Sequence, residues 1–360
     1  MTDKVIPIYT PFIDKIEEDL VNDCMKSTWI SSKGAYINKF EEQIKAYTNA
    51  DYCTTTSSGT SALHLAMLAL NIGKDDEVIT TNFTYVASTN AILYVGAKPV
   101  FCNIRSEDLN IDVESIKSKI TPKTKAILYT NVYGFLCDYD RLNEIAKKHG
   151  LFLIEDAAES FGATYKNSMS GTLGDISTFS FFGNKTITTG EGGMVLCKNS
   201  EHYNKIKKLK NQGNSERTYF HDVLGYNYRM TNIQAAIGIG QLNKIEKIIS
   251  LKKRLYYNYK SNLENKVRFI NELEGTEPSY WMTPIIFDSQ SKKEKVEIKL
   301  KENSIETRPL FTPIDQLPFY EKSSCESANT IYKLGILLPS YPSLSDKDQN
   351  KICKIINSII

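Results

Sequence analysis

KAILYTNVYGFLCDYDRLNEIAKKHGLFLIEDAAES, residues 125–160, contains one full unit of the strand and helix alternation from which the fold can be predicted. The unit begins with an apolar, β-rich run at 125–134 and ends with another at 151–160. Between them, residues 138–149 open with acidic side chains, carry apolar residues at helical spacing, gather lysines late and stop at Gly150, which is typical of a capped surface helix. This order predicts two parallel strands joined by a crossover helix.

The same alternation continues on both sides, from about residue 55 to residue 200. Further β-rich runs are EVITTN (77–82), KPVFCNI (98–104) and STFSFF (177–182). TSALHLAMLAL (60–70) is apolar nearly all round, which predicts a buried helix, and the small polar run TTTSSG (54–59) before it predicts a turn. We therefore expect an α/β fold in which the start of this helix is a candidate anion site.

The pattern changes after about residue 230. Residues 231–263 form a single long helical pattern, and weaker alternation follows. We place a domain boundary near residue 245, with a large domain at 1–245 and a small C-terminal domain at 246–360.

Composition excludes several classes of protein. The 360 residues hold 44 Lys and Arg against 42 Asp and Glu, so no strong field draws in nucleic acid or an anionic membrane. The seven cysteines are widely spaced without CxxC, which indicates reduced thiols rather than disulfides or a zinc site. No apolar run reaches the length of about 18 residues that a membrane helix needs, and the start lacks a secretory pattern. We expect a soluble cytoplasmic protein with no nucleic acid, membrane or metal partner.

Two charged residues stand where predicted strands end. Lys185 lies in SFFGNKTITTGEGG (180–193), where a strand gives way to a glycine-lined loop, and sites in α/β sheets lie at such strand ends. Asp156 ends the apolar strand at 151–156, with Glu155 and Glu159 beside it. A buried carboxylate needs a partner, which is either a helix cap, a salt bridge or the protonated nitrogen of a bound heterocycle.

These features together fit pyridoxal phosphate. That cofactor needs a lysine for a Schiff base, an acid facing the pyridine nitrogen and donors for its phosphate. Lys185 and Asp156 supply the first two, and the helix start at 58–60 with Ser180 supplies the third. Tyr85, at another strand end, is placed to stack on the ring.

At these residues the chain resembles the DegT/DnrJ-type sugar aminotransferases, which are fold type I enzymes dependent on pyridoxal phosphate. The likeness covers nearly the whole chain and is most specific at FFGNKTITTGEGG (181–193) and GYNYRMTN (225–232). It also includes STWISSKG (27–34), SSGTSALHLA (57–66), ITPKTKAI (120–127), IETRPLF (305–311) and LLPSYPSLS (337–345). The resemblance implies a large cofactor-binding domain with a mixed, mostly parallel sheet and a smaller C-terminal α/β domain.

The resemblance also assigns roles to single residues. It implies that Lys185 bonds the cofactor covalently, that Asp156 contacts the pyridine nitrogen and that Glu159 lies near the ring hydroxyl. The remaining cofactor contacts that it implies are Tyr85 on the ring face, Gly59, Thr60 and Ser180 at the phosphate, and Asn227 from a second subunit. The last contact implies a homodimer with shared active sites.

The run FFGNK is similar to relatives that aminate C4 of a sugar rather than C3, and Lys185 argues against relatives that are dehydratases and carry His there. The resemblance therefore implies transfer of an amino group from L-glutamate, through pyridoxamine phosphate, to C4 of a nucleotide-linked 4-keto-6-deoxyhexose. GDP-4-keto-6-deoxymannose is the first candidate and dTDP-4-keto-6-deoxyglucose the alternative. The product would feed cell-surface polysaccharide synthesis, such as that of O antigen.

Candidate substrate contacts are Trp29, Arg229, Arg308, Thr312 and Asp315. The two arginines would pair with the diphosphate or the donor carboxylate, or else form structural ion pairs. Asn131, Thr312 and Asp315 stand where relatives often have His, at positions that the resemblance places toward the sugar. Two other classes stay open, a non-catalytic regulator that binds pyridoxal phosphate and an α/β binding protein without a cofactor.

Overall fold

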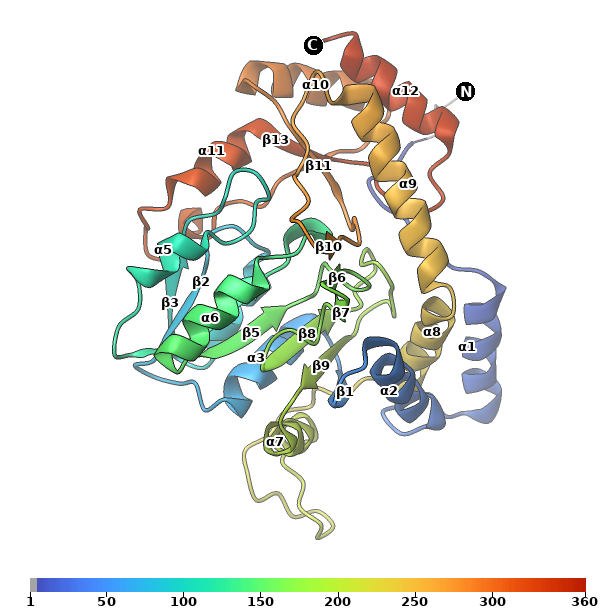
Figure 1. Ribbon diagram of the computed structural model, residues 1–360. Coiled ribbons are helices and arrows are strands. Elements are labelled where there is room, and N and C mark those ends of the chain that lie inside the picture. The colour runs from blue at the N-terminus through green and yellow to red at the C-terminus, as the bar shows by residue number, and fades with distance from the viewer. Residues whose placement is uncertain (1–4) are drawn as a thin grey trace.

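A seven-stranded sheet forms the centre of the computed structural model, which describes residues 5–360 (Figure 1). Its strand order is β1-β9-β8-β5-β4-β2-β3. The strands are β1 (Tyr52–Thr56), β2 (Glu77–Thr81), β3 (Lys98–Cys102), β4 (Thr124–Thr130), β5 (Phe152–Asp156), β8 (Ile176–Ser180) and β9 (Gly193–Cys197). β9 runs antiparallel to both of its neighbours, and the other pairings are parallel. The expected α/β fold with a large, mostly parallel sheet is confirmed.

Alternate residues of the strands pack against helices on the two faces of the sheet. On β4, Ala126 and Leu128 join the cluster formed with α3 (Gly59–Ala69), α4 (Val86–Tyr94) and α7 (Ser200–Lys210). Ile127 between them joins the opposite cluster with α5 (Val113–Lys117) and α6 (Tyr139–His149). This period of two is what a strand buried on both faces requires.

The helix expected at 138–149 is present as α6. The Asp138 side chain caps its start by accepting from the backbone N–H of Arg141, and Gly150 ends it in the left-handed region at φ 65°. The helix expected at 60–70 is α3.

The turn expected at 54–59 is wrong in its first half, because residues 54–56 belong to β1. The Glu41 carboxylate accepts from the Thr54 hydroxyl at 3.0 Å and from the backbone N–H of Thr55 at 2.7 Å. This tertiary contact satisfies polar groups that would otherwise favour a turn.

The single long helix expected at 231–263 is also wrong. The chain forms α8 (Asn232–Leu242) and α9 (Ile245–Leu263), and Lys244 between them leaves the helical region at φ −122°. The Lys244 amine lies 2.7 Å from a Glu17 carboxylate oxygen and 3.0 Å from one of Asp14, at the start of α1 (Lys15–Ser27). The buried ion pair holds Lys244 in this non-helical link.

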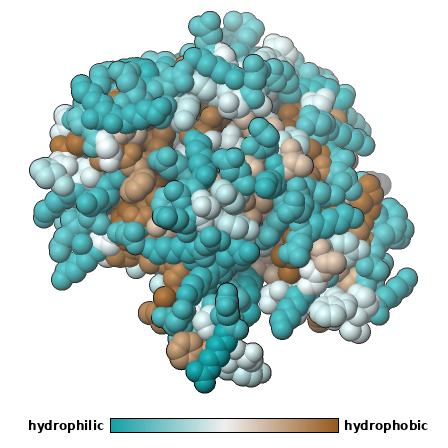
Figure 2. All heavy atoms as spheres, turned by 60° about the horizontal axis from the view of Figure 1, so that its bottom comes forward, coloured by the Kyte–Doolittle hydropathy of each residue, from teal (hydrophilic) through white to brown (hydrophobic). Residues whose placement is uncertain are grey.

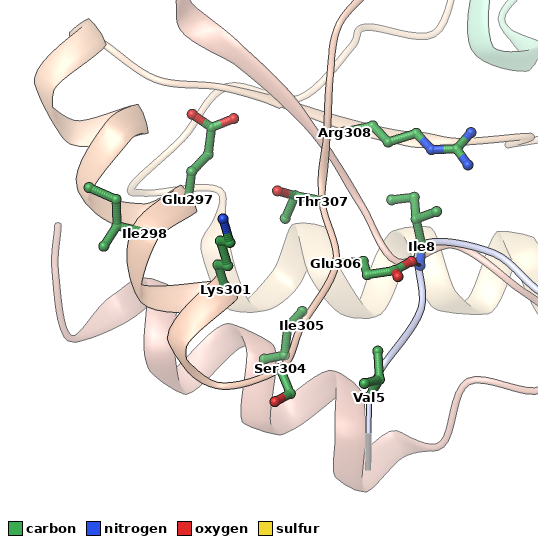
Figure 3. Close-up of a pocket in the computed structure, with 10 residues that line it drawn as sticks. All are labelled: Val5, Ile8, Glu297, Ile298, Lys301, Ser304, Ile305, Glu306, Thr307 and Arg308. Atoms are coloured by element: carbon green, nitrogen blue, oxygen red, sulfur yellow. Dashed lines mark hydrogen bonds between the residues drawn. The ribbon is translucent and has the colours of Figure 1, made fainter. Parts of the chain in front are cut away.

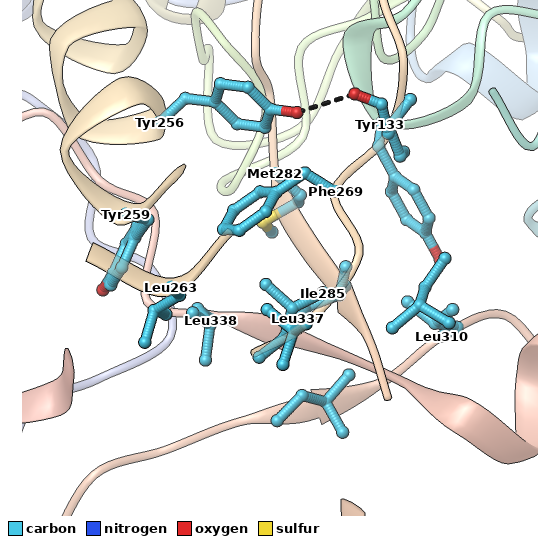
Figure 4. Packing of buried hydrophobic residues seen from close by; sticks show 14 of the residues in the cluster. Tyr133, Tyr256, Tyr259, Leu263, Phe269, Met282, Ile285, Leu310, Leu337 and Leu338 are labelled. Carbon is cyan, nitrogen blue, oxygen red and sulfur yellow. Dashed lines mark hydrogen bonds between the residues drawn. The ribbon is translucent and has the colours of Figure 1, made fainter. Parts of the chain in front are cut away.

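The C-terminal part of the chain forms a second sheet with strand order β11-β13-β12. Its elements are β11 (Thr283–Ile286), α10 (Gln290–Glu302), β12 (Arg308–Pro309), α11 (Glu326–Leu334), β13 (Gly335–Leu338) and α12 (Asp346–Asn357). Its hydrophobic core also includes residues from earlier in the chain, such as Tyr133 on η1 (Val132–Gly134) (Figure 4). Near the N-terminus, Ile6 bonds to the backbone of Ser304 and Glu306. The domain boundary near residue 245 stays a prediction.

The remaining elements are short or lie at the edges. They are α2 (Ala35–Thr48), β6 (Thr164–Tyr165), β7 (Ser168–Met169), β10 (Thr276–Glu277) and η2 (Ile314–Gln316). Within residues 5–360, no helix is both long and apolar enough to cross a bilayer. The face turned forward in Figure 2 is mostly hydrophilic, with hydrophobic side chains in small groups.

Candidate active site

The carboxyl ends of β5 and β8 bring the two charged residues singled out in the sequence to one edge of the sheet. These strands are parallel, with Asp156 opposite Thr178, so the chain leaves both at the same edge. Asp156 is the last residue of β5, and Lys185 lies in the loop that follows β8. The Asp156 residue is 3% exposed and the Lys185 side chain 11%, so both lie in a largely dry setting.

Asp156 is held by two hydrogen bonds. The Ser88 hydroxyl donates to its Oδ2 at 2.5 Å, and the backbone N–H of Ala158 donates to its Oδ1 at 3.1 Å. Burial raises the pKa of Asp156, while the bonds from Ser88 and Ala158 and the charge of Lys185 oppose that rise. The carboxylate is therefore fixed in position and depends on its donors to stay ionised.

Lys185 is held between two aromatic side chains. Its amine lies 3.9 Å from the centre of the Trp281 ring, and the indole N–H donates to the Asn184 carbonyl at 2.6 Å. The Tyr9 hydroxyl donates to the carbonyl of Lys185 itself at 2.8 Å. Burial lowers the pKa of the amine, against the opposing charges of Glu159 and Asp156.

Glu159 faces the same amine. One of its oxygens lies 3.9 Å from Lys185 Nζ, and the other accepts from the backbone N–H of Tyr133 at 2.7 Å. Burial raises the pKa of Glu159 to about 7, with Lys185 opposing the rise. Both members of the pair are thus displaced toward their neutral forms, and a neutral amine is able to accept a proton.

The start of α3 provides a set of donors. Ser58 and Ser61 form a reciprocal cap, which leaves the N–H groups of Gly59 and Thr60 without an acceptor among residues 5–360. A Cβ on Gly59 would stand 2.7 Å from Cβ of Ser180, so only glycine lets this turn approach β8. Free N–H groups beside a hydroxyl suit a phosphate group. The amine of Lys185, the carboxylates of Asp156 and Glu159, and the N–H groups at the start of α3 therefore fit pyridoxal phosphate.

Tyr85 precedes α4 and is 57% exposed, with its ring centre 6.2 Å from that of Phe311. Such an exposed ring is free to cover a ligand, and its stacking on the cofactor stays a prediction. Asn227 is exposed and accepts from the Arg229 guanidinium at 3.1 Å. Its expected contact with the site of a second subunit is also a prediction.

The candidate substrate residues are spread over several elements. The Arg229 guanidinium also donates to Asn211, and Arg308 lies exposed on β12. Neither pairs with a carboxylate among residues 5–360, where Arg105, Arg141 and Arg254 form the arginine ion pairs. The structural ion pairs considered for both are therefore absent from the described part of the chain.

Arg308 also borders a pocket of about 710 Å³ between α10 and the N-terminal segment. Figure 3 shows its side chain extending away from α10, which carries Glu297 and Lys301. None of the residues that surround Lys185 lines this pocket. It is therefore separate from the candidate active site.

Asn131 was expected to lie toward the sugar, and this is wrong. It is fully buried, and its amide donates to Glu155 Oε1 at 2.9 Å while its oxygen accepts from the N–H of Cys137. The carboxylate of Asp315, also buried, accepts from the hydroxyl and N–H of Ser323. Trp29 is 56% exposed and Thr312 half-buried, and contacts of Trp29, Thr312 and Asp315 with substrate stay predictions.

Sequence reasoning missed four residues that shape the site: Tyr9, Ser88, Tyr133 and Trp281. Trp281 offered a signal, because it is one of only two tryptophans in the chain. The others come from remote segments and meet Lys185, Asp156 and Glu159 only through folding.

Comparisons with known proteins agree with this geometry. Residues 11–357 match the model of the DegT/DnrJ/EryC1/StrS aminotransferase family. The chain is 47% identical to GDP-perosamine synthase of Escherichia coli O157:H7, over 98% of each chain. It is 45% identical to GDP-perosamine synthase of Vibrio cholerae, over 98% of this chain and 99% of that one. A sugar aminotransferase of Streptococcus pneumoniae, solved in its PMP form, superposes with a TM-score of 0.94 at 26% identity, over 99% of this chain and 98% of that one.

Proposed function

The chain belongs to the DegT/DnrJ/EryC1/StrS aminotransferase family, as the resemblance predicted, and from that premise we propose that it transfers an amino group from L-glutamate to C4 of GDP-4-keto-6-deoxymannose. The product would be GDP-perosamine. The observation that carries the proposal is the buried amine of Lys185, 3.9 Å from Glu159. The 47% identity to a GDP-perosamine synthase supports the choice of substrate.

Bound pyridoxal phosphate supplies a carbonyl that exchanges amino groups and a ring that delocalises electrons. Asp156 would hold the ring nitrogen in its protonated form, since it is a buried carboxylate with fixed donors. The first turn of α3 and Ser180 would hold the phosphate.

Lys185 would move the proton. Its amine is buried between Trp281 and Glu159, and burial favours the neutral form that acts as a base. It would take a proton from the α-carbon of glutamate and later deliver one to C4 of the sugar. Glu159, with its own pKa raised to about 7, is placed to exchange a proton with this amine near neutral pH.

The test of the proposal uses the two half-reactions separately. The purified protein is converted to its amino form with glutamate, desalted and mixed with one keto sugar, while the visible absorbance of the lysine-bound cofactor is followed. The absorbance should return with GDP-4-keto-6-deoxymannose and not with dTDP-4-keto-6-deoxyglucose, and Lys185→Ala serves as the control. Return with the dTDP sugar alone would move the assignment to that substrate. A protein that binds the cofactor but never reacts with glutamate would either use another amino donor or be a regulator.

We also propose that two copies form a homodimer with shared sites. The segment between α7 and α8 extends away from the body of the molecule (Figure 1), and it exposes Tyr219 by 96% and Leu224 by 86%. Apolar side chains this exposed favour burial against a second copy.

The seven free cysteines are consistent with a reducing cytoplasm.

A further inference from the structure

Three buried hydroxyl groups, those of Thr84, Ser88 and Thr130, lie next to Asp156 at the start of α4 and the end of β4. The Ser88 hydroxyl donates to Asp156 Oδ2 at 2.5 Å. Thr84 Oγ1 lies 3.0 Å from Ser88 Oγ and 3.0 Å from Thr130 Oγ1. The three hydroxyl residues are at most 2% exposed, so bulk water does not replace these bonds.

The direction of these bonds follows from counting protons. A hydroxyl carries one proton: Ser88 gives its proton to Asp156, and Thr84 gives its own proton to Thr130. A hydrogen bond donated to a carboxylate stabilises its charged form. The arrangement therefore favours a charged carboxylate over a neutral one.

The position of these residues is set by the fold. Thr130 is the last residue of β4 and lies opposite Asp156 in the parallel register. Ser88 lies in the first turn of α4, and Thr84 lies in the loop just before that helix. Hydroxyls from two neighbouring elements thus converge on the end of β5.

We propose that Ser88 is a positioning residue that keeps Asp156 ionised where it meets the ring nitrogen of the cofactor. The inference rests on the proposed function, because it assigns Asp156 to that nitrogen. The charged groups that face Asp156 are Lys185, from the loop after β8, and Glu159, from its own loop. On β8, the residue opposite Asp156 is the uncharged Thr178.

The experiment measures binding of pyridoxamine phosphate to the cofactor-free protein between pH 5.5 and pH 9. This ligand has no carbonyl, so it forms no bond to Lys185, and its own titration is common to all variants. Affinity should fall toward low pH as Asp156 takes up a proton. Ser88→Ala should move that midpoint upward by about one pH unit, and so weaken binding about tenfold below the wild-type midpoint, because a hydrogen bond to a charged group has about that strength.

Ser177→Ala is the matched control. Ser177 is also a buried serine that donates to a buried carboxylate, at 2.9 Å from Glu155 Oε2, but that carboxylate is bound by the protein's own groups. It should lower thermal stability without moving the midpoint. Ser88→Thr should restore the midpoint, and Ser88→Cys, a weaker donor of similar size, should move it partway and tests the idea even where Ser88→Ala fails to fold.

An unchanged midpoint in Ser88→Ala or Ser88→Cys would overturn the inference, and so would an equal movement in Ser177→Ala. Failure of the wild-type protein to bind pyridoxamine phosphate at any pH would instead overturn the proposed function. The two failures are therefore distinguishable.

Discussion

The amine of Lys185 lies 3.9 Å from the centre of the Trp281 ring, although the two residues come from different sheets of the molecule. Lys185 lies in the loop after β8 of the large sheet, and Trp281 lies two residues before β11 of the small one. The same indole donates to the Asn184 carbonyl at 2.6 Å. One side chain of the C-terminal part therefore holds both the backbone and the amine of the reactive loop.

Replacing Trp281 should separate these two effects. Trp281→Phe keeps a ring face toward the amine and loses the bond to Asn184, whereas Trp281→Leu loses both. Lys185 becomes a cation as it takes up the proton, and a cation–π contact of a desolvated ammonium contributes up to about 2 kcal/mol, so we expect the leucine variant to react with glutamate about tenfold more slowly than the phenylalanine variant. Single-turnover kinetics measure this difference. Equal rates in the two variants would show that the ring face has no effect on the amine.

Glu159 should make the cofactor-free protein less stable as pH rises. Its pKa in the folded protein is raised from 4.5 to about 7, so the folded state holds a proton that the unfolded state releases between these values. Glu159→Gln has no carboxyl group at this position and should not lose stability in this way. Its free energy of unfolding, relative to wild type, should rise by about 2.5 kcal/mol between pH 5 and pH 8. Urea unfolding at several pH values checks this, and a difference that stays constant would contradict the buried charge.

Lys252 should have the opposite effect and make the protein more stable as pH rises. Lys252 is 1% exposed and donates to the Ser340 carbonyl at 2.7 Å, and it has no carboxylate partner among residues 5–360. Burial lowers its pKa from 10.5 to about 7. The unfolded state therefore binds more protons between pH 7 and pH 10.5, so wild-type stability rises with pH in that window. The advantage of Lys252→Met over wild type should shrink by about 3 kcal/mol from pH 7 to pH 9.5. Guanidinium titrations that find the same advantage at both pH values would contradict it.

Gly59→Ala should weaken binding of the cofactor. A Cβ at this position would stand 2.7 Å from Cβ of Ser180, so the start of α3 must move away from β8. Overpacking of this kind costs about 1–3 kcal/mol, and we expect the dissociation constant of pyridoxal phosphate to rise about tenfold or more. Gly73→Ala is a suitable control, because the nearest atom to its Cβ position is the Val95 carbonyl oxygen at 3.8 Å and it lies before β2, away from the carboxyl ends of the strands. Equal affinity of Gly59→Ala and wild type for pyridoxal phosphate would show that the start of α3 does not hold the phosphate.

Much of the fold could be predicted because local signals and packing agree. Asp138 and Gly150 cap α6 in the way their residue types favour, and the apolar run before Asp156 forms β5. The errors arose where a distant residue overrides the local pattern. Glu41 draws Thr54 and Thr55 into β1, and Glu17 holds Lys244 out of the helix.

The site divides in the same way. The meeting of Lys185 and Asp156 at one edge of the sheet was predictable because the strands before them are parallel, and the helix start at Gly59 because a small polar run precedes it. Ser88 and Trp281 were not, since nothing local distinguishes a serine in the first turn of a helix from its neighbours. The burial of Asn131 against Glu155 was equally invisible, because it depends on two strands meeting in register.

The central claim is that Lys185 moves the proton during amino transfer. The most direct measurement is a stopped-flow record of the cofactor's visible absorbance after glutamate is added, in wild type and in Lys185→Ala loaded with pyridoxal phosphate. We expect the visible absorbance of wild type to be lost within the time of one turnover. The variant should still bind glutamate but should fail to convert the cofactor to its amino form. Completion by Lys185→Ala at a rate within a few-fold of wild type would contradict the account.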